Sequence, residues 1–162
     1  MMMSCERNVG RRRRCYETDR LLNESDRPQD ADRGGPDLME DAVVTCAPHT
    51  DGLALAHVMA EQGFGSLPVV NQDRKLVGMV SEYDLLQAII EGRDPRKITA
   101  AELITKKKVL SVTEQTALVE LANLFQDHYV TRIPVVRDGK LIGLVARRDL
   151  VYGYIRALQY WS

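Results

Sequence analysis

The chain has 162 residues, of which 44% are hydrophobic and 28% are charged, and its formal net charge at pH 7 is -1. This composition is typical of an ordinary soluble globular protein with one domain or two small modules, and the near-zero charge gives no reason to expect a nucleic-acid or membrane partner. No apolar run reaches the roughly eighteen residues that a membrane helix needs, and the N-terminus lacks the apolar segment of a secretory signal.

The cysteines and histidines carry no recognisable metal or disulfide pattern. Cys5, Cys15 and Cys46 are an odd number without a Cys-x-x-Cys pair, and the three histidines are scattered. We therefore expect no disulfide framework, no metal site and a reducing, cytoplasmic location.

Residues 1–36 differ from the rest of the chain because they contain few large apolar residues and many turn formers. They include the run Arg11–Arg14, but eight arginines against seven acids leave the segment nearly neutral. We predict a disordered tail, since such a segment cannot bury enough apolar surface to fold alone. The alternative is that the arginine run is a nucleic-acid or localisation patch.

From Asp37 onward the chain contains an internal duplication. Aligning residues 67–71 and 75–85 with residues 133–137 and 140–150 gives nine identities in sixteen pairs. The spacing of about 65 residues is longer than in solenoid repeats, and two copies are too few for an array. The pattern therefore indicates two fused copies of one supersecondary unit.

In the first copy, the predicted elements are a strand at Val43–Cys46, an amphipathic helix, a strand at "PVV", a polar turn and a strand at Leu76–Val80. The helix has its apolar residues at Leu55, Val58 and Met59, and a second helix begins near Asp84. We expect Pro68 to begin its strand, where a missing N–H is tolerated. The segment Glu91–Lys97 is the predicted connector.

The second copy predicts the same order, with strands at Val109–Val112, "PVV" and Leu141–Val145, and with Gly139 in a hairpin turn. The apolar faces of its two helices are Leu118, Leu121, Ala122 and Phe125, and Val151, Tyr154, Ile155 and Leu158. Each copy thus reads β-α-β-β-α. The fold class is α/β, of an α+β sandwich type, in which the two units bury their sheets against each other.

The repeated line holds the candidate functional residues. Ser81 is a good helix N-cap, and Asp84 is placed to complete a capping box. The second copy has Ala146 in place of the serine but keeps Asp149. The retained carboxylate suggests a task besides capping, such as accepting hydrogen bonds from the vicinal hydroxyls of a ribose.

The pattern Gly-x-x-x-x-Pro-Val-Val, then a turn, then Gly-h-h-Ser/Thr-x-x-Asp (h, hydrophobic) resembles the cystathionine-β-synthase (CBS) domain. The segments Asp37–Met39 and Ala101–Thr105 resemble the family's lead-in to each first strand. The resemblance implies a tandem pair, or Bateman module, about a pseudo-twofold axis, with domains at 37–92 and 101–158 and a connector at 93–100. It also implies homodimers, and two clefts that each hold AMP, ADP, ATP or S-adenosylmethionine.

By this resemblance, the first cleft holds the ribose at Asp84 and a phosphate at Arg132. Its residues would be Met79, Ser81, Tyr83, Asp84, Thr105, Val109, Val130, Thr131, Arg132 and Ile133. The weaker second cleft would use Phe64, Gly65, Ser66, Leu67, Leu144, Ala146, Arg147, Arg148 and Asp149.

The second cleft departs from the family pattern at Ala146 and at Glu40, whose carboxylate would repel phosphate if it faced the ligand. Two interpretations of Arg147 and Arg148 stand: they bind phosphate in compensation, or they form a solvated basic turn.

No catalytic signature is present: the chain lacks Gly-x-Ser-x-Gly, and "GFGSLP" lacks the lysine of a P-loop. We expect a protein that is not an enzyme, requires no cofactor and modulates an unknown partner protein in response to an adenosine compound. The alternative function is a ligand-free scaffold for dimerisation or interaction.

Overall fold

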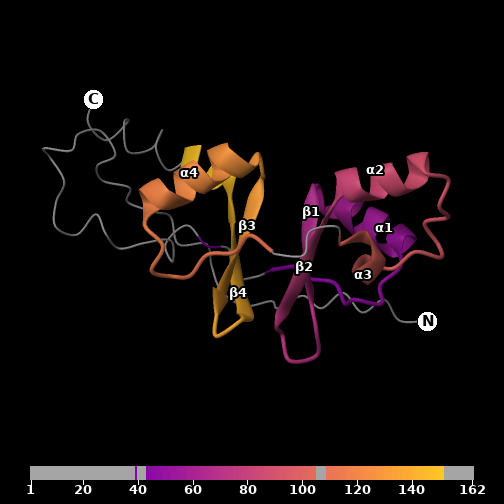
Figure 1. The fold of residues 1–162 in the computed structure, drawn as a ribbon, viewed down its shortest axis with the longest axis horizontal. Helices are drawn as coiled ribbons and strands as arrows, with labels where there is room; N and C mark the ends of the chain where they lie inside the picture. The colour runs from indigo at the N-terminus through magenta and orange to yellow at the C-terminus, as the bar shows by residue number, and fades with distance from the viewer. Residues whose placement is uncertain (1–38, 40–42, 105–108, 152–162) are drawn as a thin grey trace, which may run out of the picture. The chain divides into compact units, whose positions relative to one another are not determined.

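The structure is a computed structural model that describes residue 39 and residues 43–104 and 109–151 (Figure 1). The chain forms two compact units. Among the described residues, the first unit holds residues 43–104 and 109–110 with the turn at 138–141, and the second holds residues 39, 111–137 and 142–151. The predicted tail at 1–36 lies outside the described residues.

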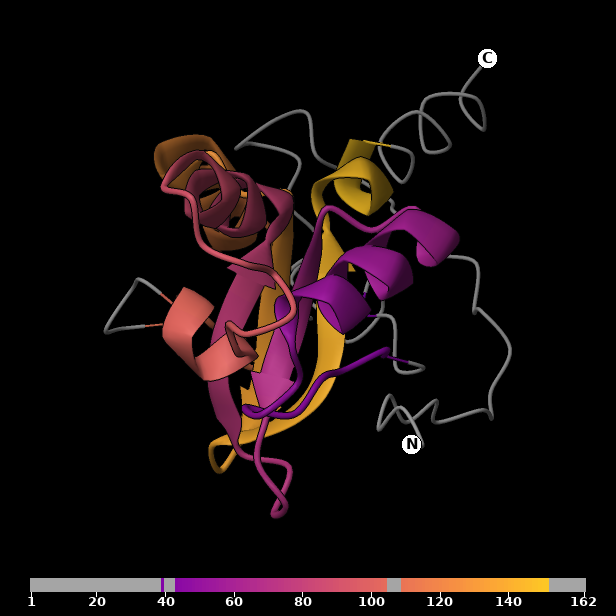
Figure 2. The ribbon, with the colours of Figure 1, turned by 90° about the vertical axis from the view of Figure 1, so that its right-hand side faces the viewer.

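The first unit is built on an antiparallel hairpin of β1 (Ser66–Val70) and β2 (Leu76–Ser81), with an irregularity in register between Val69 and Val70. Helices α1 (Gly52–Gln62), α2 (Glu82–Ile90) and α3 (Ala100–Leu103) cover one side of this hairpin (Figures 1 and 2). The mixed helices and strands confirm the predicted α+β class.

Helix α1 is capped at both ends by residues next to it in the sequence. The Asp51 side chain accepts a hydrogen bond from the Ala54 N–H at 2.8 Å, and Gly63 ends the helix with a φ of 65°. The predicted apolar face is confirmed, because Leu55, Val58 and Met59 are all buried.

The second unit contains α4 (Leu118–His128), β3 (Arg132–Arg137) and most of β4 (Lys140–Ala146), followed by helical residues 147–151. Leu121 and Phe125 are buried as predicted, whereas Leu118 is only half-buried and Ala122 is exposed. Asp138 and Gly139 both have positive φ, as a tight hairpin turn requires. The predicted apolar face of the last helix lies outside the described residues beyond Val151.

The predicted first strands are wrong in extent, since within the described residues they are reduced to isolated bridge residues, Val44 and Cys46 in the first copy and Val112 in the second. Cys46 pairs with Val69, and Val112 pairs with Val135. The Cys46 N–H donates to the Pro68 carbonyl at 3.0 Å, and the Val70 N–H donates to the Cys46 carbonyl at 2.9 Å.

Two prolines explain why the pairing of Cys46 with β1, and of Val112 with β3, does not continue toward the N-terminus as a regular ladder. Pro68 is the third residue of β1, not its first, and Pro134 has the same place in β3. In a regular parallel ladder the residue two before Val70 would donate the next hydrogen bond, but Pro68 has no N–H. The same argument applies to Pro134, two residues before Val136.

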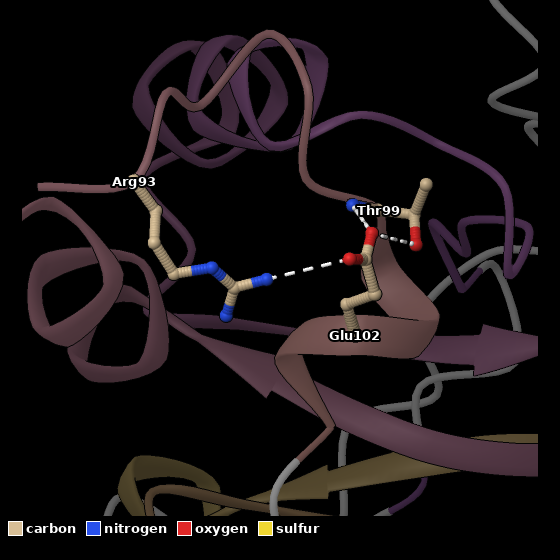
Figure 3. Close-up of polar contacts among 3 residues, drawn as sticks. All are labelled: Arg93, Thr99 and Glu102. Atoms are coloured by element: carbon tan, nitrogen blue, oxygen red, sulfur yellow. Dashed lines mark hydrogen bonds and ion pairs between the residues drawn. The ribbon is translucent and has the colours of Figure 1, made fainter. Parts of the chain in front are cut away.

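The connector lies against α1 and ends in the capped helix α3. The Gly52 N–H donates to the Ile98 carbonyl at 2.9 Å. Glu102 accepts hydrogen bonds from the Thr99 N–H at 2.8 Å and the Thr99 hydroxyl at 2.9 Å, and it pairs with Arg93 at 3.4 Å (Figure 3). The Thr99 hydrogen bonds, with a smaller effect of the Arg93 charge, hold the pKa of Glu102 below its ordinary value.

Helix α4 ends at a strained residue that yields a stability prediction. Tyr129 has a φ of 52° at the position where the first repeat has Gly63, and its side chain is exposed. We expect Tyr129→Gly to stabilise the protein by roughly 1 kcal/mol, because glycine adopts this conformation without steric cost. Urea unfolding measures the change, and Gly63→Ala should have the opposite sign. A lower unfolding midpoint for Tyr129→Gly would contradict the interpretation.

Candidate functional site

The junction of β2 and α2 carries the principal candidate residues. Ser81 is the N-cap of α2, and its hydroxyl accepts from the Asp84 N–H at 3.3 Å. The Oδ2 of Asp84 accepts from the Ser81 N–H at 2.7 Å and from the Ser81 hydroxyl at 2.6 Å. The predicted capping box is therefore confirmed. Both side chains are half-buried, so the carboxylate is held in place near the surface.

The start of β1 lies beside this junction. Ser66 pairs with Ser81 in the hairpin register, and the Glu82 N–H donates to the Gly65 carbonyl at 3.0 Å. The structure thus brings Gly65 and Ser66, predicted for the second cleft, next to Ser81 and Asp84, predicted for the first. The first repeat thus supplies four of the ten candidate residues of the first cleft and four of the nine candidate residues of the second.

The second unit repeats this arrangement with different side chains. The Arg147 N–H donates to the Thr131 carbonyl at 2.9 Å, as Glu82 does to Gly65. Ala146 is buried and offers no hydroxyl to Asp149. The Asp149 Oδ1 instead lies 3.9 Å from the Nε of Arg148, in an exposed ion pair. The carboxylate persists without the serine that shares its capping role in the first unit.

The remaining predicted residues divide by burial. Leu67, Ile133 and Leu144 are buried, so almost no part of these residues is open to solvent in the structure. Half-buried residues are Phe64, Met79, Val109, Val130 and Arg132, while Gly65, Tyr83, Thr131, Arg147 and Arg148 are exposed. Thr105 and Glu40 lie outside the described residues.

Each predicted cleft combines residues of both units, and their combination stays a prediction. Within the second unit, however, the structure adds a grouping that the sequence interpretation missed. Arg132 was assigned to one cleft, and Arg147 and Arg148 to the other, although all three belong to the same end of the β3–β4 hairpin. Aligning them with Ser66, Glu82 and Tyr83 would have revealed this grouping from the sequence.

In the part of the chain that the structure describes, no group of three or more His, Cys, Asp or Glu side chains is arranged to hold a metal ion. Within the same residues, no helix is long and apolar enough to cross a membrane.

The chain is similar to known proteins over most of its described length. It is 30% identical over 115 residues to Hypoxic response protein 1 of Mycobacterium tuberculosis, covering 70% of this chain and 80% of that protein. A crystal structure of Hypoxic Response Protein I with two coordinated zinc ions matches with a TM-score of 0.65 and 30% identity, covering 72% of this chain and 94% of that one.

A second solved structure, CBSX2 in complex with AMP, matches with a TM-score of 0.64 and 30% identity, covering 74% of this chain and 94% of that chain. The family profile of the CBS domain matches twice, at residues 35–91 and 100–155. The duplicated line, the two similar units and these matches agree, and the chain belongs to the CBS domain family as a tandem CBS-domain protein.

Proposed function

We propose that this protein is a regulatory module that binds an adenosine compound between its two CBS repeats and thereby modulates a separate partner protein. The observation that carries the proposal is the carboxylate held at the β2–α2 junction, which the second repeat keeps at Asp149 without its serine. The 30% identity to CBSX2, whose solved structure contains AMP, supports the ligand class.

In the proposed mechanism, a ribose is bound by the carboxylate of Asp84 or Asp149. Phosphate is bound by the guanidinium groups of Arg132, Arg147 and Arg148. A carboxylate can accept hydrogen bonds from both hydroxyls of a diol, and a guanidinium suits phosphate oxygens by bidentate hydrogen bonding. A ligand shifts the module only as far as its affinity differs between two conformations, so regulation requires that binding and partner contact be coupled. We infer that the protein has no catalytic activity. Its cytoplasmic location and the domain boundaries at residues 37–92 and 101–158 stay predictions.

Isothermal titration calorimetry tests the binding proposal. AMP, ADP, ATP and S-adenosylmethionine are titrated into the full chain, with the guanosine nucleotides as matched controls. We expect saturable binding of at least one adenosine compound and no comparable binding of its guanosine counterpart. Absence of binding by all four compounds would contradict the proposal and favour the ligand-free scaffold.

A homodimer is the second part of the proposal, and the outer face of α2 supports it. Large apolar side chains stand exposed there at helical spacing: Tyr83 (70%), Leu86 (53%), Ile89 (52%) and Ile90 (69%). A contiguous exposed apolar face of this kind marks an interaction surface. Because Ser81 caps α2, this apolar face would connect the ligand site with the contact between subunits.

We expect Leu86→Lys with Ile90→Lys to convert a dimer into a monomer, because two buried charges would oppose association. Multi-angle light scattering after size-exclusion chromatography gives the mass. Val119→Lys on α4 is the matched control, since Val119 is a similarly exposed apolar residue at 53%. An unchanged mass for the α2 double variant would contradict this interface.

A further inference from the structure

Two lysines face each other where the turn of the β3–β4 hairpin pairs with the turn of the β1–β2 hairpin. Lys75 and Lys140 form an isolated antiparallel bridge, and both residues are exposed. Residues 138–141 belong to the first unit, so this contact lies within that unit. The paired segments 74–76 and 139–141 are here called the turn bridge.

Two backbone hydrogen bonds close the turn bridge, one on each side of the lysines. The Leu76 N–H donates to the Gly139 carbonyl at 3.0 Å, and the Leu141 N–H donates to the Arg74 carbonyl at 2.9 Å. The lysines are therefore a non-hydrogen-bonded pair, in which the Cα atoms lie about 4.5 Å apart and the side chains are closest. Because directly opposite residues point to the same face, the two positive charges are neighbours.

No ion pair offsets the repulsion between these two charges. Among the described residues neither lysine has an ion-pair partner, and Asp73 and Asp138, the acids of the two turns, do not pair with them. Like charges that lie directly opposite each other destabilise strand pairing, and salt screens exposed charges. The turn bridge is consequently weakest at low ionic strength.

The other contributions to the turn bridge act in opposite directions. Arg74, whose carbonyl accepts one of the two hydrogen bonds, has a φ of 60°, which costs free energy for a residue with a side chain. Its counterpart in the second repeat is Gly139, which adopts a φ of 76° without that cost. Burial of Leu141, which is only 2% exposed, favours closure. A small change in the lysine repulsion can therefore shift the balance between closed and open forms.

We propose that the turn bridge is a charge-sensitive latch, which opens before the rest of the first unit unfolds and closes more tightly when the lysine charges are screened or neutralised. Ionic strength is the input of this device, and the closed population is its output. The inference goes beyond the proposed function, because it requires no adenosine compound.

Amide hydrogen exchange of the full chain, followed by NMR, tests the latch. Protection factors are compared for Leu76 and Leu141, whose N–H groups close the bridge, and for Cys46, whose N–H donates to Pro68 in the same unit. At low salt we expect protection at least about ten-fold lower at Leu76 and Leu141 than at Cys46. Raising the salt from about 0.01 M to about 1 M shortens the screening length from about 30 Å to about 3 Å and should raise their protection about three- to ten-fold. Equal protection at all three amides, or no response to salt, would overturn the proposal.

Charge reversal across the bridge separates lysine repulsion from other causes of opening. Lys140→Glu places a carboxylate opposite Lys75, so we expect about three- to ten-fold higher protection at Leu76, and Lys75→Glu should do the same at Leu141. Reading the amide on the opposite strand avoids the direct effect of a new side chain on the exchange of the next residue. The double variant restores like charges and should return protection to near its original value. Unchanged protection in both single variants, or an equal rise in the double variant, would contradict the latch.

Discussion

Asp84→Asn is expected to weaken adenosine binding about 100-fold while lowering stability by no more than about 1 kcal/mol. The asparagine retains the size of the side chain and one acceptor oxygen, but it loses the negative charge and the second acceptor. If the carboxylate holds both hydroxyls of a ribose, both charge-assisted hydrogen bonds are weakened or lost. Calorimetric titration of the best adenosine ligand measures the affinity, and urea unfolding measures the stability.

Two matched variants separate ligand binding from helix capping. Ser81→Ala removes the capping hydroxyl and reproduces the natural Ala146–Asp149 combination, so we expect about 1 kcal/mol lower stability with a much smaller loss of affinity. Asp149→Asn applies the same chemical change to the second repeat. A loss of affinity in Asp149→Asn but not in Asp84→Asn would move the ligand to the other cleft, and unchanged affinity in both would contradict the ribose role.

The parts of the fold that were predictable from the sequence depend on local chemistry. The Asp51 and Ser81 caps, the positive φ of Gly63 and Gly139, and the buried face of α1 all follow from residues close together in the chain. The internal duplication strengthened the predicted order of helices and strands, since the same order had to fit two different sequences. Ala122 was mispredicted because a small residue at helical spacing can lie at the edge of an apolar face and still be exposed.

The parts that were not predictable depend on contacts between distant segments. The apolar residues at Val43–Cys46 predict a strand, but its length is set by the partner, where Pro68 cannot supply the next donor. In the same way, the candidate residues of each cleft were identified as family positions, while their grouping within a unit emerged from the hairpin register.

Gly78→Ala is expected to destabilise the protein by about 2 kcal/mol, because Ile104 occupies the space that a Cβ would need. A Cβ at Gly78 would lie 2.6 Å from the Ile104 Cδ1 and 2.8 Å from both its Cγ1 and Cγ2, so the whole side chain would have to move. Ile104 directly follows α3, and this short helix packs against β2. The glycine of the repeated line is therefore a packing residue that admits α3 to the sheet.

A double-mutant cycle tests this explanation with urea unfolding. Ile104→Ala removes the obstructing atoms, so Gly78→Ala should cost at least about 1 kcal/mol less in that background than in the unmodified protein. Gly65→Ala is the matched control, since its nearest contact would be the Glu82 carboxylate at 3.7 Å, and we expect a small change. Additive effects of the two substitutions would show that the cost of Gly78→Ala arises elsewhere than at Ile104. A strong coupling would assign the glycine to packing and leave ligand recognition to the residues at the end of β2.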